Sequence, residues 1–212
     1  MRLIRYINEQ TPPVKKAATS LELGQVIDTI RKECKPFLKE VGPLVDHNSP
    51  IFRGIKNPPR IWTIMKGTRG SDRTPKFTAK EIFEIFDKAF ADKFGWWVRS
   101  KGVFTGDKGT ADGYGDPNLF IPMGNYKYVW ASDYAKVWSN LTRPNKFAAL
   151  TDEEKRTWLT HIEGKAKEAV KVYKNTGLKS AVKGHFFYEA VFQVKKYIVV
   201  SFPTWIKVKD RL

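Results

Sequence analysis

The stretch HFFYEAVFQVKKYIVVSF, residues 185–202, is the longest strand-like segment of the chain. Alternate side chains of a strand share a face, so one face carries Phe186, Tyr188, Ala190, Phe192 and Val194. The other face carries Phe187, Glu189, Val191 and Gln193. Glu189 therefore places a carboxylate among apolar neighbours on a long strand, where a charged side chain is uncommon.

Other segments of the chain have strand or helix patterns as well. Strand-like segments are RLIRYI (2–7), IFRGI (51–55), RIWTIM (60–65), WWVRSKGVFT (96–105), NLFIP (118–122) and YKYVW (126–130). Capping boxes at 19–22, 78–81 and 151–154 predict helices over about 19–41, 78–95 and 151–176. Because strands and helices do not alternate regularly, we expect an α+β fold with a mostly antiparallel or mixed sheet.

Composition limits the classes of function. The 212 residues are 42% apolar, which is enough for a packed core in one domain. Three histidines and one cysteine do not suggest a zinc site or a disulfide framework. No signal peptide or membrane span is visible, so we expect a soluble cytoplasmic protein. The net charge of +16 indicates either a polyanionic partner or a generally basic surface.

The glycine-rich segment GVFTGDKGTADGYGDPN, residues 102–118, suggests a phosphate-binding loop but has none of the known spacings. Two interpretations remain open: a backbone that approaches a ligand closely, or a flexible connection between strands. The sequence shows no serine–histidine–aspartate or cysteine–histidine arrangement. A metal cluster is not evident either.

Three features follow one another along the chain. Arg53 lies inside the short apolar strand IFRGI and is followed by Gly54, and Thr105 ends the strand WWVRSKGVFT. Glu189 on the long strand is the third feature. Their order and placement resemble the ADP-ribosyltransferase superfamily. In that family an arginine on an early strand precedes a Ser/Thr-bearing strand that leads into a short helix, and a glutamate lies on a later strand.

Some residues match the family pattern and others differ from it. The triplet Phe104-Thr105-Gly106 takes the place of the usual Ser-Thr-Ser and keeps only the middle hydroxyl. Ala111 and Tyr114 match an alanine and an aromatic residue that often follow the triplet. Phe187 stands two positions before Glu189, where a second acidic residue is common in the family. In this superfamily such a change often accompanies a different acceptor.

The resemblance also predicts the organisation of the chain. Segments between about residues 50 and 200 look like a group of uncharacterised bacteriophage proteins. The family fold implies a split antiparallel or mixed sheet with flanking helices. We expect a single domain over 1–212, with an N-terminal strand and helix in 1–45. The ADP-ribosyltransferase-like core would occupy 46–212 and contain a helical insertion near 150–176.

The resemblance implies NAD as a substrate and no metal. A bidentate guanidinium at Arg53 would hold the diphosphate, and Gly54 would let backbone groups approach the nicotinamide amide. The Thr105 hydroxyl would orient the glutamate or the ribose. Glu189 would hold the ribose 2′-hydroxyl and stabilise the cationic sugar of the transition state. Further expected contacts to NAD come from Arg99, Ser100 and Tyr114.

The function implied is mono-ADP-ribosyl transfer from NAD by a phage-encoded enzyme acting in the host cytoplasm. The acceptor would be a host protein or a nucleic acid. The alternative is a basic nucleic-acid-binding or inhibitory interaction protein that has the same type of fold without the reaction. Basic residues interleaved with aromatic ones, as in GNYKYVW (124–130) and FQVKKY (192–197), are typical of nucleic-acid binding.

Overall fold

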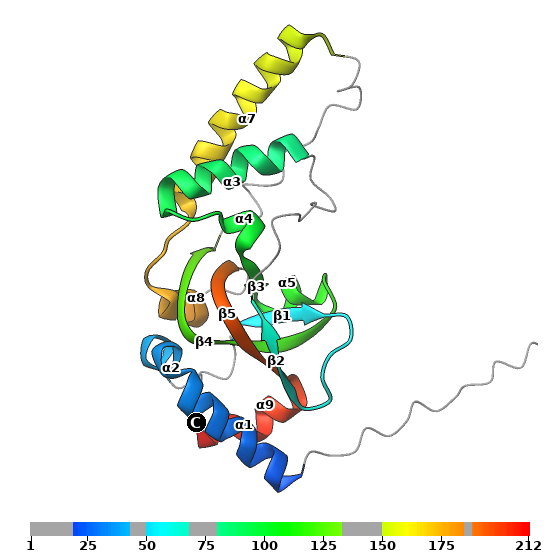
Figure 1. Ribbon diagram of the computed structural model, residues 1–212, viewed down its shortest axis with the longest axis vertical. Coiled ribbons are helices and arrows are strands. Elements are labelled where there is room, and N and C mark those ends of the chain that lie inside the picture. The colour runs from blue at the N-terminus through cyan, green and yellow to red at the C-terminus, as the bar shows by residue number, and fades with distance from the viewer. Residues whose placement is uncertain (1–18, 43–49, 68–79, 133–149, 185–187) are drawn as a thin grey trace, which may run out of the picture.

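A computed structural model describes residues 19–42, 50–67, 80–132, 150–184 and 188–212. The helices are α1 (Ser20–Glu33), α2 (Lys35–Val41), α3 (Lys80–Phe94), α4 (Val98–Lys101), α5 (Lys108–Asp112), α7 (Asp152–Val172), α8 (Leu178–Gly184), α9 (Phe202–Val208) and a final 3-10 turn (Lys209–Arg211). The strands are β1 (Phe52–Ile55), β2 (Trp62–Lys66), β3 (Val103–Gly106), β4 (Asp116–Ala131) and β5 (Glu189–Ser201). Figure 1 shows their arrangement. The expected α+β class is confirmed.

The sheet is built around a long antiparallel ribbon of β4 and β5. Ala131 pairs with Glu189 at one end of the ribbon, and the register shifts between Met123 and Tyr126. The second edge of β5 pairs with β3 near its start and with β2 near its end. Strand β1 pairs with both β3 and β4, which closes a small barrel. All these pairings are antiparallel, as expected.

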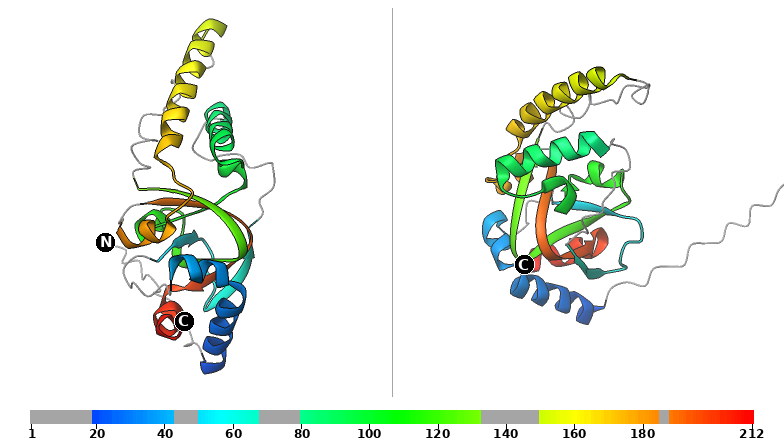
Figure 2. Two further views of the ribbon diagram at one scale, coloured as in Figure 1. Left: turned by 90° about the vertical axis from the view of Figure 1, so that its left-hand side faces the viewer. Right: turned by 45° about the horizontal axis from the view of Figure 1, so that its top comes forward.

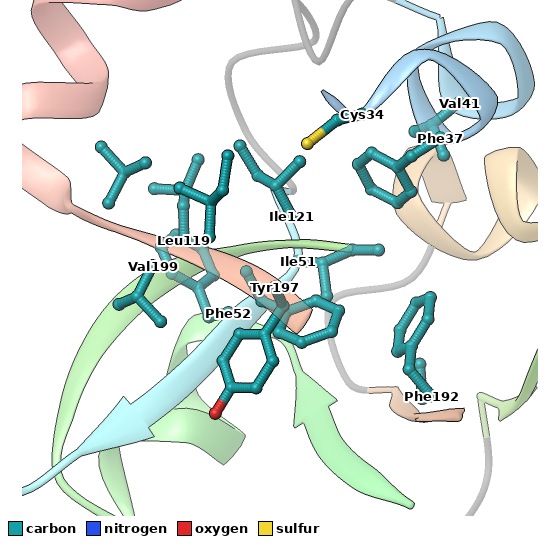
Figure 3. Close-up of a cluster of buried hydrophobic side chains, with 14 of the residues drawn as sticks. Cys34, Phe37, Val41, Ile51, Phe52, Leu119, Ile121, Phe192, Tyr197 and Val199 are labelled. Carbon is teal, nitrogen blue, oxygen red and sulfur yellow. The ribbon is translucent and has the colours of Figure 1, made fainter. Parts of the chain in front are cut away.

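Near the start of β5 its two faces are buried against different partners, which explains why both are apolar there. One cluster of side chains fills the barrel and extends under α1, α2 and α9; Figure 3 shows part of it, including Cys34, Phe37, Phe52, Leu119, Phe192 and Tyr197. A second cluster joins α3, α4 and α7 to the outside of the sheet, with Phe86, Phe90, Val191 and Tyr173 among its members. Burial of the apolar surface of these two clusters is the main stabilising contribution to the fold.

Several predicted helix ends are confirmed. The capping boxes at Thr19 and Thr151 form with the expected hydrogen bonds, and Gly95 ends α3 with a φ of 73°. The capping box at Thr78 lies outside the described residues. The single helix expected over 19–41 is wrong: it breaks at Cys34 between α1 and α2, because Pro36 lacks an N–H to continue the first helix.

The predicted strands correspond only partly to the observed ones. NLFIP and YKYVW are two halves of one strand, β4, and RLIRYI lies outside the described residues. The prediction that WWVRSKGVFT is a single strand is wrong, because its first half forms the helical turn α4 and only its end forms β3.

Helices lie at both ends of the barrel. Figures 1 and 2 show α3 and α7 packed together at one end, with much of α7 projecting beyond the sheet, and α1 and α9 at the other. None of the described helices combines the length and the apolar composition that a membrane span requires.

Candidate functional site

A cavity of about 230 Å³ opens beside β1, β3, the start of β5 and the turn after α5. Six of the seven residues predicted for the site line it: Arg53, Gly54, Arg99, Thr105, Tyr114 and Glu189. The seventh, Ser100, is not among the lining residues. Side chains that are far apart in sequence thus share one cavity.

Strand pairing explains why these residues meet. Phe52 pairs with Gly106, so Arg53 on β1 comes close to the end of β3. Gly106 in turn pairs with Glu189, and Thr105 pairs with Ala190. The barrel closes at this point, and the three strands therefore bring a guanidinium, a hydroxyl and a carboxylate to the same wall.

Arg53 is held from within the protein but is not fully satisfied. Its Nη1 donates to the Phe104 carbonyl at 2.9 Å, and its guanidinium lies over the Tyr197 ring, 5.6 Å from the centroid. Its Nε is buried without a hydrogen-bond partner, and no carboxylate of the described residues pairs with the guanidinium. Burial lowers the pKa of Arg53 from its ordinary value, while the Tyr197 phenol acts in the opposite direction. Unsatisfied buried donors are rare and call for an explanation.

Glu189 is held through one of its two oxygens. Oε1 accepts hydrogen bonds from Arg99 Nη1 at 3.2 Å and from the Tyr173 hydroxyl at 2.7 Å. The side chains of Arg99 and Glu189 are 15% and 12% exposed, and the Arg99 guanidinium lies 4.6 Å from the centroid of the Phe104 ring. Among the described residues, no donor reaches Oε2. That oxygen is left to accept a hydrogen bond from a ligand.

The Thr105 hydroxyl has a backbone partner. Its Oγ1 donates to the Ala190 carbonyl at 2.9 Å, and the residue is 4% exposed. The hydroxyl proton is therefore engaged by β5. Toward a ligand, only the lone pairs of this oxygen remain to accept a hydrogen bond.

Gly54 has a packing role that the sequence did not reveal. A Cβ added there would lie 2.1 Å from the Ala111 carbonyl oxygen and 2.9 Å from the Gly115 nitrogen. The turn after α5 thus rests directly on β1. Tyr114, which belongs to the same turn, is 67% exposed at the rim of the cavity. The turn forms one side of the cavity because a residue without a side chain lets it approach.

The helical turn α4 is fixed by a buried carboxylate on α3. Asp87, which is 4% exposed, accepts hydrogen bonds from the backbone N–H groups of Arg99 at 2.7 Å and Ser100 at 3.2 Å. This explains why the segment is helical rather than extended, and it places Arg99 beside Glu189. Ser100 is engaged through its backbone instead of lining the cavity.

No family model, curated protein or solved structure matches the chain.

Two side chains of the site were missed by sequence reasoning. Asp87 stands next to the apolar stripe of α3, and a carboxylate in that position could have suggested a buried cap. Tyr173 follows α7 and reaches Glu189 only through the tertiary fold, so the sequence gives no local signal for it. Both act on residues that line the cavity.

A larger hollow of about 490 Å³ lies between α3 and α7. Its floor includes Ile85, Ala89 and Val170, and its rim carries lysines and carboxylates of both helices. Its described lining residues include no serine, threonine, cysteine or histidine. Among the described residues there is also no group of side chains suited to a metal ion. The smaller cavity brings together the Arg53 guanidinium, whose Nε has no partner, and the partly desolvated Glu189 carboxylate, which Arg99 and Tyr173 hold.

Proposed function

We propose that the protein is a NAD-dependent mono-ADP-ribosyltransferase whose barrel corresponds to the split sheet of that superfamily. The observation that carries the proposal is the meeting of Arg53, Thr105 and Glu189, from three different strands, in one cavity. Arg53 has one buried donor, Nε, that no described residue satisfies, and Glu189 has an acceptor, Oε2, that no described residue uses. A ligand that combines an anion with hydroxyl groups would meet both needs.

The reaction breaks the bond between the nicotinamide nitrogen and C1′ of the ribose. The electron pair of that bond leaves with nicotinamide, C1′ becomes electron-poor, and a nucleophile of the acceptor forms the new bond and loses its proton to solvent. Oε2 of Glu189 would accept from the ribose 2′-hydroxyl and place negative charge beside the developing cation. The 12% exposure of this side chain means that little water screens the interaction.

The cavity would enclose only the reacting end of the dinucleotide. At about 230 Å³ it is smaller than the roughly 300–1,000 Å³ of pockets that bury a whole drug-sized ligand. Arg53 and Arg99 place two guanidinium groups along it, which suits the neighbouring diphosphate. Tyr114 at the rim offers a ring on which a planar group can stack. The adenosine end would extend over the surface.

The net charge of the chain bears on the nature of the acceptor. The chain carries 38 lysines and arginines against 22 acidic residues, which favours an anionic acceptor such as a nucleic acid or an acidic protein surface. A host macromolecule of that kind would be the acceptor if the protein is encoded by a phage.

Transfer of label from radiolabelled NAD to components of a bacterial lysate tests the proposal. Glu189→Gln removes the charge and keeps the shape, so we expect labelling to fall by about 100-fold or more. Glu40→Gln is the matched control, because the Glu40 carboxylate accepts from the hydroxyls of Tyr126 and Tyr128 and is not part of the cavity lining. Full labelling by Glu189→Gln, or none by the folded wild type, would refute the proposal.

One observation favours the alternative of nucleic-acid binding. Lys66 and Lys196 are direct cross-strand neighbours on β2 and β5, both are exposed, and neither pairs with a carboxylate of the described residues. Like charges in this arrangement destabilise a sheet unless an anion lies nearby. Nucleic-acid binding that weakens steeply with salt, without turnover of NAD, would support that function instead.

A further inference from the structure

The hydroxyl of Tyr173 is the least expected part of the site. Tyr173 is the residue that follows α7, it is 1% exposed, and its hydroxyl donates to Glu189 Oε1 at 2.7 Å. Its ring packs edge-on against Phe90 of α3, with 4.8 Å between the centroids. These contacts hold the Tyr173 side chain in one orientation, with its hydroxyl against a carboxylate of the cavity.

The backbone around Tyr173 is fixed on two sides. From α3, the ammonium of Lys93 donates to the carbonyls of Val170 at 2.7 Å and of Tyr173 at 3.2 Å, which satisfies groups that the end of a helix leaves free. From β4, Trp130 exchanges two backbone hydrogen bonds with Lys174, at 2.8 and 2.9 Å. The end of α7 is therefore anchored to both a helix and the sheet.

Both side-chain hydrogen bonds to Glu189 reach the same carboxylate oxygen. Tyr173 and Arg99 both donate to Oε1, so together they fix the rotation of the carboxylate and leave Oε2 without a donor from the described residues. Arg99 alone could fix it only through one long side chain at 3.2 Å. The shorter bond comes from Tyr173, whose ring has little freedom to move.

We propose that Tyr173 is a positioning residue for the catalytic carboxylate, and that α7 is present in this chain to supply it. This inference rests on the proposed function. It gives a role to the helical insertion near 150–176, which the family resemblance leaves unexplained. The tyrosine orients Glu189 for the transition state but does not contact NAD.

Tyr173→Phe removes one oxygen and keeps the ring that packs on Phe90. We expect kcat for NAD to fall by about 10- to 100-fold, because the carboxylate loses the shorter of its two hydrogen bonds and its orientation. KM for NAD should stay within about twofold, because the residues that would bind the diphosphate are unchanged. Steady-state kinetics on purified protein, with folding checked by circular dichroism, gives both values.

Tyr128→Phe is the matched control, because the Tyr128 hydroxyl also donates to a carboxylate, that of Glu40, and does not line the cavity. It should lower the thermal midpoint, since the hydroxyl also accepts from the Leu178 N–H, and leave kcat unchanged. If Tyr173→Phe does not fold, Lys93→Met, which loosens the same helix end, should lower kcat with KM unchanged.

The outcomes separate this inference from the function on which it rests. A wild type that turns over NAD, together with a Tyr173→Phe variant of equal kcat, would overturn the positioning role and leave the enzyme activity standing. A rise in KM with kcat unchanged would also overturn it, since that pattern indicates a role in binding. A wild type that is folded but does not turn over NAD would overturn both.

Discussion

Replacing Gly54 by alanine adds one methyl group at the point where the turn after α5 meets β1. The new Cβ would lie 2.1 Å from the Ala111 carbonyl oxygen and 2.9 Å from both the Gly115 nitrogen and the Tyr114 carbonyl carbon. All three neighbours are backbone atoms, which cannot rotate away as a flexible side chain can. The turn must therefore move as a unit if the variant is to fold.

The expected loss of stability in Gly54→Ala follows from these distances. Cβ atoms essentially never approach other heavy atoms closer than 3.0 Å, so the Ala111 oxygen must retreat by close to an ångström. Inserting a methyl group into a packed region costs about 1–3 kcal/mol, and more where backbone has to shift. We expect the free energy of unfolding to fall by about 3 kcal/mol or more, a change of over about 100-fold in the folding equilibrium.

Gly164→Ala is the matched control. Gly164 lies within α7, and a Cβ there would meet nothing within 4 Å. Alanine is a better helix former than glycine by about 1 kcal/mol, so the same substitution should stabilise the protein at this position. Urea unfolding followed by circular dichroism measures both variants. A Gly54→Ala variant within about 1 kcal/mol of wild type would show that the turn does not rest on β1 and that the cavity lacks this wall.

Two further predictions concern buried groups away from the reacting atoms. Asp87→Asn keeps the shape of the side chain but replaces one of two carboxylate acceptors by an N–H donor that faces the backbone N–H groups of α4. Urea unfolding should therefore show that the free energy of unfolding falls by about 1–3 kcal/mol. An unchanged midpoint would contradict the capping role of Asp87. Burial raises the pKa of the Cys34 thiol to about 12. The native protein should therefore not react with a thiol reagent at pH 8, whereas the urea-unfolded chain should react at once. Rapid reaction of the native protein would show that α1 and α2 do not cover the barrel.

The sheet was the part of the fold most accessible from sequence. Alternation in residues 185–202 correctly predicted a long strand, and β5 occupies Glu189–Ser201 of it. The segments IFRGI and RIWTIM are also strands, because short β-rich runs bounded by proline and glycine leave few other choices. Closure of the barrel could not be predicted, since it depends on β4 pairing with both β1 and β5.

Tertiary contacts explain the errors. The run WWVRSKGVFT has a good strand composition, but the Asp87 carboxylate satisfies two backbone N–H groups there and stabilises a helical turn. The reason for Gly54 was also hidden, because the Ala111 carbonyl that excludes a Cβ lies 57 positions along the chain (111 − 54). Tyr173 could not be linked to Glu189 without knowing where α7 ends. Each case involves a partner that no local pattern identifies.

The prediction that Arg53, Thr105 and Glu189 share a site came from their order along the chain, and their shared cavity is independent of that reasoning. Their hydrogen bonds add an argument of a different kind. An arginine and a glutamate retained only for stability would be expected to pair with each other when both lie in the same poorly solvated region. Here Arg53 bonds to a backbone carbonyl and Glu189 to Arg99 and Tyr173. Their separation leaves the unsatisfied Nε of Arg53, which costs folding free energy, and the Oε2 oxygen of Glu189 on the walls of one cavity. This is the arrangement that the proposed ligand, which carries both an anion and hydroxyl groups, would require.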